Sequence, residues 1–377
     1  MKNVRFVGLD VHAETIAVAV AESGGEVRSL GIIPNRCESV ARLIRRLGKP
    51  EQLRVCYEAG PTGYALYWEL TRLGVKCEVV APTLVPVKAG DRVKTDRRDA
   101  ERLARCHRAG DLTAVWVPDA AHEALRDLVR AREAAKTDQL RARHRLTKFL
   151  LRHGRRPAEG VLAWTVKYWA WVKSRVHFEQ PAQTATFIDY VHEVEHAAAR
   201  IQRLEQAIDA SVEIVPPKMR AVIEALQALR GVAQVSAVTM VAELGQISRF
   251  ARARQLMGYS GAVPREHSSG PRIRRGAISK AGNAHLRRVV IEAAWSYRHR
   301  PSIGRKLAAR QRGQTETVKE IAWRAQHRLF HRYRKLMAAG KTRQQVITAI
   351  GRELLGFIWA IGVYVEKESP SRVTLAA

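Results

Sequence analysis

Cysteine is scarce in this chain of 377 residues. It has four, Cys37, Cys56, Cys77 and Cys106, all in the first third and none in a Cys-x-x-Cys pair. Disulfide frameworks and structural zinc sites both need cysteines that are more numerous or more closely spaced. The sequence therefore predicts a reduced compartment, in which these thiols act as small hydrophobic side chains.

Long apolar runs are also missing. The longest one near the C-terminal end, residues 354–365, is shorter than the roughly 20 residues that span a bilayer, so we expect a buried helix there. The chain begins with an apolar strand pattern that lacks the charged segment, apolar segment and cleavage site of a secretory leader. We therefore expect a cytoplasmic protein with no membrane partner.

Acidic residues are outnumbered, with 36 Asp and Glu against 65 Lys and Arg, and the formal net charge is +29. This excess favours a polyanionic partner, in the first place nucleic acid. The most basic stretch, residues 249–300, holds twelve Lys or Arg and two acidic residues. Because no zinc finger or other major-groove reader accompanies it, the charge indicates affinity for phosphate rather than recognition of a base sequence.

Residues 1–118 have the pattern of an α/β domain, in which a three-stranded antiparallel meander is followed by alternating helices and strands. The expected strands are 4–10, 15–23, 26–33, 53–60 and 75–82, and the expected helices are 38–48, 63–74 and about 96–109. This order predicts a mixed sheet flanked by helices.

The rest of the chain is predicted to be helical. Apolar side chains recur at seven-residue spacing within residues 119–215, at Phe187, Val194, Ile201, Ile208 and Val215. Such heptads predict a coiled coil or a helical hairpin arm, or equally an amphipathic helix packed on its own domain. The aromatic segment 164–173 is expected in a core more often than stacked on bases. Residues 216–377 are expected to be helical around a Gly/Ser/Arg-rich loop at 258–282.

Four carboxylates fall at predicted strand ends or at a predicted helix start. They are Asp10, Glu58, Asp96 and Asp99. Residues three apart share a helix face, so Asp96 and Asp99 can both point at the sheet edge where the other two emerge. A cage of hard oxygen ligands suits two Mg²⁺ ions, which favour in-line displacement at phosphorus. The alternative is structural: Asp96 as a helix N-cap, and Asp10 and Glu58 as solvated strand ends.

The chain resembles, over nearly its whole length, the bacterial insertion-sequence transposases of the one-ten family, DEDD transposases described as bridge-RNA-guided recombinases. The resemblance is carried by the blocks "VGLDVH", "YEAGPTGY", "VVAPTLVPVKAGDRVKTDRRDAERLA" and "GYSGAVPREHSSGPRIRRGAISKAGNAHLRRVVIEAAW". It implies an RNase H-like (RuvC-like) N-terminal domain whose acidic tetrad matches the four carboxylates, a coiled-coil arm, and a mostly α-helical C-terminal domain.

The resemblance also implies a chemistry. The family's catalytic serine corresponds to Ser269 in "PREHSSG", which would attack a DNA phosphodiester and form a covalent phosphoserine linkage. The tetrad and its Mg²⁺ would act on the same phosphate in a composite site. By spacing alone a Ser-Ser-Gly loop is ordinary turn chemistry, and the neighbouring Ser268 leaves open which hydroxyl attacks. Residues 229–245 resemble a helix-hairpin-helix in which Ala233 replaces the second hairpin glycine.

The implied partners are donor and target DNA, a structured guide RNA and further copies of the chain in a dimer or tetramer, at the bacterial nucleoid. Basic residues near the tetrad and the serine loop are expected to contact phosphates. They are Lys94, Arg97, Arg98, Arg265, Arg272, Arg274, Arg275, Lys280, Arg287 and Arg288.

Two other classes of function fit parts of the pattern. A metal-dependent, structure-specific DNA nuclease resembling a junction resolvase would use the tetrad with water and would not need Ser269. A non-catalytic nucleic-acid-binding protein would use its carboxylates only to cap helices, and would tolerate substitution of Asp10. An actin-like kinase strand is a poor match for "VGLDV", because no Gly-rich phosphate turn follows it.

Overall fold

A computed structural model describes residues 4–87, 90, 94–270 and 272–368 of the chain. The chain divides into two compact units, Met1–Val117 and Pro118–Ala377.

Unit 1 is built on a five-stranded mixed sheet. Its strands are β1 (Arg5–Val11), β2 (Thr15–Glu22), β3 (Val27–Pro34), β4 (Leu53–Glu58) and β5 (Lys76–Val80), in the spatial order β3-β2-β1-β4-β5. The first three strands form the antiparallel meander, and β4 pairs in parallel with both β1 and β5. The predicted strands and their order along the chain are confirmed.

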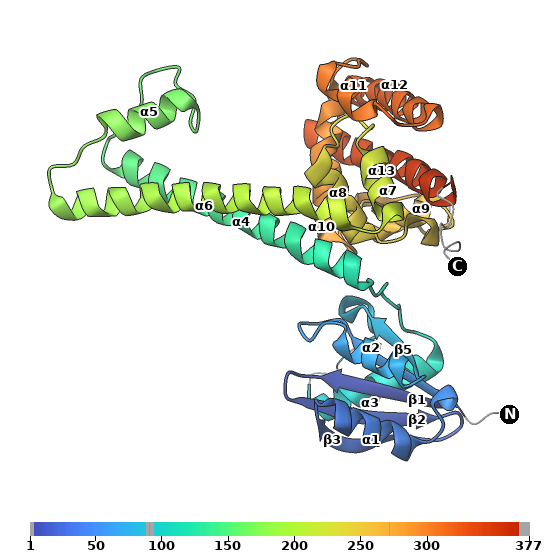
Figure 1. Ribbon diagram of the computed structural model, residues 1–377. Helices are drawn as coiled ribbons and strands as arrows, with labels where there is room; N and C mark the ends of the chain where they lie inside the picture. The colour runs from blue at the N-terminus through green and yellow to red at the C-terminus, as the bar shows by residue number, and fades with distance from the viewer. Residues whose placement is uncertain (1–3, 88–89, 91–93, 271, 369–377) are drawn as a thin grey trace, which may run out of the picture. The chain divides into compact units, whose positions relative to one another are not determined.

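Helices cover both faces of this sheet (Figure 1). Helices α1 (Cys37–Leu47) and α2 (Ala65–Arg72) pack on the face that carries Val7, Leu9 and Val55. Helix α3 (Asp96–Ala109) packs on the opposite face. Short 3₁₀ turns precede β4 and follow β5, at Pro50–Gln52 and Pro82–Leu84. This three-layer arrangement confirms the predicted RNase H-like α/β fold.

Small residues let α3 lie unusually close to the sheet. Ala17, Ala19 and Ala21 of β2 pack against Ala100 and Ala104 of α3. In β1, a Cβ atom at Gly8 would stand 2.3 Å from the carbonyl oxygen of Ala100. Only glycine fits such an approach of two backbones. The glycine and alanines therefore fix where the first turn of α3 lies over the sheet.

Unit 2 begins with a long helical hairpin formed by α4 (Ala120–Arg152) and α6 (Pro181–Ile214), which lie side by side in Figure 1. Val194, Ile201 and Ile208, three of the heptad positions, are buried in it. The short helix α5 (Val166–Arg175) packs near its far end, where Tyr168 and Val172 are buried with apolar residues of α4 and α6. The aromatic segment 164–173 therefore belongs in large part to a core, and the heptads pair with a helix of the same chain.

The remainder of unit 2 is a helical bundle, which confirms the predicted helical C-terminal part. Its helices are α7 (Pro217–Leu226), α8 (Gln234–Leu244), α9 (Ala253–Tyr259), α10 (Ala284–Ala294), α11 (Arg305–Gln311), α12 (Glu316–Ala338) and α13 (Arg343–Glu368), with 3₁₀ turns η3 (Ile247–Arg249) and η4 (Trp295–Arg298). Gly231, in the turn between α7 and α8, packs against the backbone of α10: a Cβ there would stand 2.5 Å from the Ala293 oxygen.

Helix α13 contains the apolar run 354–365 and is buried as predicted, with Leu354, Leu355, Ile358 and Ile361 inaccessible to solvent. Among the described residues it is also the one helix that is long and apolar enough to cross a bilayer. Half of its apolar window is buried inside the unit, as in the core helix of many proteins.

Candidate active site

Two of the predicted carboxylates lie where neighbouring parallel strands end. Asp10 lies near the end of β1, and Glu58 is the last residue of β4, which pairs with β1 in parallel. Side chains two apart share a face of a strand. Gly8 touches α3, and the Cys56 thiol donates to the Leu103 carbonyl of α3 at 3.7 Å. Asp10 and Glu58 therefore emerge on the face that α3 covers.

The other two carboxylates lie in the first turn of α3, over that same edge of the sheet. The N-cap of this helix is Thr95, whose hydroxyl accepts a hydrogen bond from the backbone N–H of Arg98 at 3.3 Å. Asp96 is the first helical residue rather than the N-cap, so the capping interpretation of Asp96 is wrong. With the cap supplied by Thr95, both carboxylates of α3 are available for another role.

One half of the site consists of Asp10, Asp96 and a residue that the sequence interpretation did not select, His12. The Nε2 atom of His12 lies 3.4 Å from Asp10 Oδ2 and 3.5 Å from Asp96 Oδ1. One ligand atom from each of the three side chains lies within 4.8 Å of the other two, a spacing that suits a metal ion.

The other half of the site consists of Glu58 and Asp99, which face a second residue that was missed, Arg102. A guanidinium nitrogen of Arg102 lies 2.7 Å from Asp99 Oδ1 and 3.9 Å from Glu58 Oε1. Lys94 stands 4.0 Å from Asp99, which is only 5% exposed. Arg102 follows Asp99 by three residues on one helix face, a spacing from which the pairing could have been predicted.

The electrostatics of the carboxylates indicate a site that favours cations. Burial raises the pKa of Asp10, and the charges of Asp99 and Asp96 raise it further, although His12 acts in the opposite direction. Burial likewise raises the pKa of Glu58, with Asp10 and Asp99 contributing and Arg102 opposing. Like charges at close range repel each other unless a cation neutralises them. Divalent ions are held by such oxygen ligands, and the residues present fit one.

In unit 2, Ser269 lies in the connection between the two strands of an antiparallel ribbon, β6 (Pro264–Glu266) and β7 (Arg275–Ile278). Its backbone exchanges hydrogen bonds with Arg272 at 3.2 and 3.3 Å. Its side chain is exposed and forms no hydrogen bond with any residue that the structure describes. Ser269 is therefore held by its main chain while its hydroxyl stays accessible.

The neighbouring Ser268 has a different environment. Its hydroxyl donates to Glu266 Oε1 at 2.9 Å and accepts from the backbone N–H of Arg274 at 3.3 Å. Arg275 also donates to Glu266, at 3.2 Å, and these bonds lower the pKa of the Glu266 carboxyl. Ser268 therefore ties the two strands of the ribbon together, whereas the Ser269 hydroxyl is the more accessible of the two.

The basic residues predicted to bind nucleic acid differ in how they are engaged. Eight of them are exposed: Lys94, Arg97, Arg98, Arg265, Arg272, Arg274, Arg275 and Lys280. Arg287 is half-buried and donates to the Ser260 carbonyl at 2.7 Å. Arg288 is also half-buried and donates to Glu133 at 2.6 Å and Glu292 at 2.9 Å. The last two therefore also stabilise unit 2, and phosphate contact by all ten stays a prediction.

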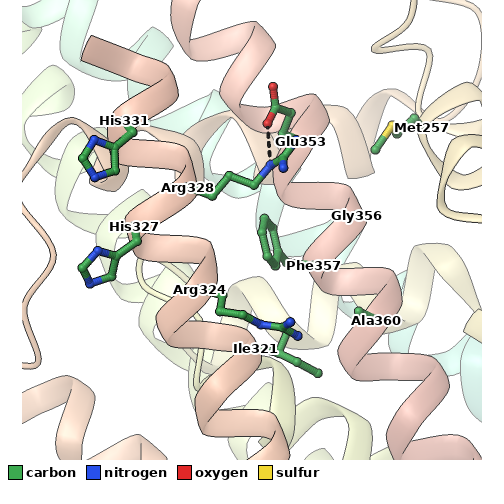
Figure 2. A pocket seen from close by; sticks show the side chains of 10 residues that line it. All are labelled: Met257, Ile321, Arg324, His327, Arg328, His331, Glu353, Gly356, Phe357 and Ala360. Atoms are coloured by element: carbon green, nitrogen blue, oxygen red, sulfur yellow. Dashed lines mark hydrogen bonds and ion pairs between the residues drawn. The ribbon is translucent and has the colours of Figure 1, made fainter. Parts of the chain in front are cut away.

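A groove between α12 and α13 adds basic surface that the sequence interpretation did not select. It encloses about 730 Å³ and contains none of the predicted catalytic residues. Arg324, His327 and His331 line it from α12, and Arg328 reaches across to Glu353 of α13 at 3.1 Å (Figure 2). Arginine side chains can contact phosphates, but Glu353 and apolar residues such as Phe357 also line this groove.

Comparison with known proteins identifies two family profiles along the chain. A profile of DEDD-type IS110 proteins, described as "Transposase", matches residues 7–154. A profile described as "Transposase IS116/IS110/IS902 family" matches residues 223–309. The first region contains the carboxylate site, and the second contains the serine ribbon.

Relatives match nearly the full length. The "Putative transposase y4qE" of Sinorhizobium fredii is 47% identical over 94% of this chain and 88% of its own length. The "Transposase for insertion sequence element IS1533" of Leptospira borgpetersenii is 32% identical over 90% of this chain and 99% of its own. The "Transposase for insertion sequence element IS1111A" of Coxiella burnetii is 24% identical over 78% of each.

Proposed function

This chain belongs to the IS110 family of insertion-sequence transposases, and on that premise we propose that it cuts and rejoins DNA through a covalent phosphoserine intermediate. The observation that carries the proposal is the convergence of the four carboxylates from β1, β4 and α3 on one edge of the RNase H-like sheet. We further propose that these carboxylates and Ser269 serve the same reaction.

In this reaction the Ser269 oxygen attacks a phosphorus atom of DNA. The new Oγ–P bond replaces one P–O bond of the backbone, and the hydroxyl proton of the serine is passed on as the departing DNA oxygen leaves. A free DNA hydroxyl later attacks the phosphoserine, which restores the serine and seals a new strand. Because one phosphodiester is exchanged for another, no external energy source is needed.

DEDD transposases use divalent metal ions, and we propose that Mg²⁺ is the ion used here. Asp10, Glu58, Asp96 and Asp99 would hold it. When bound, it polarises the scissile phosphate and stabilises charge on the oxygens that attack and leave. The chain's own contribution is to fix the carboxylate oxygens, which it does through the close packing of α3 on β1.

The partners are part of the proposal. DNA is the substrate that the family implies. A structured guide RNA would supply sequence choice, consistent with a net charge of +29 and no recognised major-groove reader. We propose a homo-oligomer acting on cytoplasmic DNA at the nucleoid, and phosphate contacts from exposed residues such as Arg97, Arg272 and Arg274.

The test is an assay for a protein–DNA adduct. Purified protein is incubated with Mg²⁺, its flanking RNA and a nicked target DNA that traps the intermediate, and the products are separated on a denaturing gel. Wild type and Ser268→Ala are expected to give a DNA-shifted protein band. Ser269→Ala and Asp10→Asn are expected to give none.

Two results would contradict the proposal. Cleaved DNA without a protein band, produced equally by Ser269→Ala, would make the protein a metal-dependent nuclease. An adduct that is lost in Ser268→Ala and retained in Ser269→Ala would move the nucleophile to the neighbouring hydroxyl.

A further inference from the structure

We propose that His12 is a ligand of the catalytic metal ion, and that Asp10, His12 and Asp96 form the half of the metal centre that is already arranged before the ion binds. This inference rests on the metal dependence in the proposed function. It adds a nitrogen ligand to a site that the sequence pattern predicts to be made of carboxylates alone.

The distances within this half support the assignment. His12 Nε2 lies 3.4 Å from Asp10 Oδ2 and 3.5 Å from Asp96 Oδ1. Neighbouring ligands of an octahedral ion with bonds of about 2.1 Å stand roughly 3 Å apart. The two distances from His12 Nε2 therefore exceed this spacing by only a few tenths of an ångström. The His12 and Asp96 side chains are each 52% exposed, so they have room to adjust.

The main chain of His12 is held in place. Its N–H donates to the Thr15 carbonyl at 2.8 Å, and its own carbonyl accepts from the Asn35 side chain at 2.8 Å. These bonds fix the tight connection between β1 and β2. His12 is the first residue of this connection. A ring mounted on such a turn has only its side-chain torsions left to set, and a fixed ligand loses little entropy when it binds.

The two halves of the site differ in the cations they already have. Asp99 and Glu58 face the guanidinium of Arg102, and Asp99 also faces Lys94. The ion pairs recorded for Asp10 and Asp96 in the described chain are both with the imidazole of His12. Among the described residues no lysine or arginine is recorded as an ion-pair partner of Asp10 or Asp96. This half is therefore the one that a metal ion would enter first.

The preference for different metal ions distinguishes a nitrogen ligand from a side chain that acts only through its charge. Imidazole binds cobalt and nickel ions well, whereas carboxylates alone suit magnesium and manganese. If His12 is a ligand, its loss weakens Co²⁺ binding more than Mg²⁺ binding. If His12 is only an electrostatic neighbour of the two aspartates, its loss changes both affinities in the same proportion.

The first experiment uses the full-length protein loaded with Mn²⁺ and pulsed electron paramagnetic resonance, which detects nitrogen bonded to manganese. Wild type is expected to show a directly bound ¹⁴N, and His12→Gln to lose that signal while still binding Mn²⁺. His122→Gln is the matched control, because His122 also pairs with an aspartate, Asp119 at 2.9 Å, in unit 2. This control is expected to keep the signal.

The second experiment measures affinity by titration calorimetry. In His12→Gln the Kd for Co²⁺ is expected to rise about tenfold or more, and the Kd for Mg²⁺ by less than about threefold. Asp10→Asn is expected to weaken both ions strongly. Unchanged circular dichroism of the variants would show that they remain folded.

The inference is overturned if the wild type shows no manganese-bound nitrogen, if the nitrogen signal persists in His12→Gln, or if the wild type binds no Mn²⁺. Equal weakening of Co²⁺ and Mg²⁺ would also overturn it and would assign His12 an electrostatic role. None of these outcomes decides the proposed function, because the adduct assay with Mg²⁺ and Ser269→Ala tests it separately.

Discussion

The carboxylate site of unit 1 and the serine ribbon of unit 2 are built in opposite ways. Asp99 is 5% exposed and lies on a helix pressed against the sheet through glycine and alanine. Ser269 lies on an exposed ribbon, and its hydroxyl forms no hydrogen bond within the described chain. Metal ligands must be placed to within a few tenths of an ångström, whereas a nucleophile must be accessible to a large substrate. The packing of each region suits the role that we propose for it.

A substitution at Gly8 is expected to have the largest effect, because it disrupts the close packing of α3 on β1. In Gly8→Val a Cβ atom would lie 2.3 Å from the Ala100 oxygen and 2.4 Å from the Ala104 nitrogen, so α3 cannot keep its place on β1. Displacement of reacting groups by about 1 Å costs on the order of 100-fold in rate. We expect at least that loss in adduct formation, and loss of the rise in melting temperature caused by Mg²⁺.

Gly276 of β7 is the matched control in the serine ribbon. A Cβ there would stand 4.0 Å from its nearest neighbour, the Cβ of Arg265. Gly276→Ala is expected to change the free energy of unfolding by no more than about 0.5 kcal/mol. Equal loss of adduct in both variants would contradict the view that only the metal site depends on close packing.

A second test compares a fully buried carboxylate, Glu243, with a partly buried one, Asp10. Glu243 of α8 is inaccessible to solvent and accepts from Arg130 at 2.8 and 3.0 Å and from Asn283 at 2.7 Å, with Arg126 at 3.8 Å. These partners lower the pKa of the Glu243 carboxyl in spite of its burial. Removing one member of a buried ion pair costs about 3–5 kcal/mol. We expect that loss for Glu243→Ala in urea unfolding.

Unlike Glu243→Ala, Asp10→Asn should not destabilise the metal-free protein. Because burial and neighbouring carboxylates raise the pKa of Asp10, its charged form is disfavoured in the fold. The neutral side chain introduced by Asp10→Asn should leave the free energy of unfolding unchanged or slightly higher. Metal binding should be lost. Destabilisation of the metal-free protein by Asp10→Asn would show that its charge has a structural role.

Arg102→Gln tests the difference between the two halves of the proposed metal site. It leaves Asp99 without the guanidinium that lies 2.7 Å away. The metal-free protein should therefore lose about 1–3 kcal/mol. Because a bound ion can replace the missing cation, the increase in melting temperature caused by Mn²⁺ should be larger than in wild type. A smaller increase would mean that Arg102 positions the carboxylates for the ion rather than competing with it.

The smallest expected effect is a pH dependence of stability that arises from His107 on α3. His107 is 9% exposed, its Nδ1 has no hydrogen-bond partner in the described chain, and burial lowers its pKa from the ordinary 6.5. As pH falls below this ordinary value, the unfolded chain binds the proton before the folded one, so stability falls. His107→Phe should reduce this loss, measured as the difference in urea midpoint between about pH 7.5 and about pH 5.5. An equal loss in both proteins would exclude His107 as its source.

The sequence predicted the elements of unit 1 because each is local. Alternating apolar residues specify the strands, and Gly48 and Gly110 follow the helices that they end. The same local rules failed at Asp96, which was interpreted as a possible N-cap although Thr95, one residue earlier, has that position. A cap depends on backbone torsions that differ between adjacent residues, and composition does not distinguish them.

His12 and Arg102 were missed for a different physical reason. Their importance depends on which residues distant in the chain lie beside them, Asp96 for the first and Glu58 for the second. Neither residue type is rare in so basic a chain, so nothing in the local pattern marks them. Spacing could have indicated only the pairing of Arg102 with Asp99, three residues away on α3.

Residue type and periodicity predict the order of strands and helices, the basic character and the positions of the four carboxylates at element ends. The family follows from the resemblance of whole sequence blocks. Tertiary structure alone decided that the carboxylates divide into one half with an imidazole and one with a guanidinium. Packing also decides that the Ser268 hydroxyl is hydrogen-bonded, while the Ser269 hydroxyl forms no hydrogen bond with any described residue. Those distinctions depend on distances between side chains, which are set by the packing of α3 through Gly8 and by the pairing of β6 with β7.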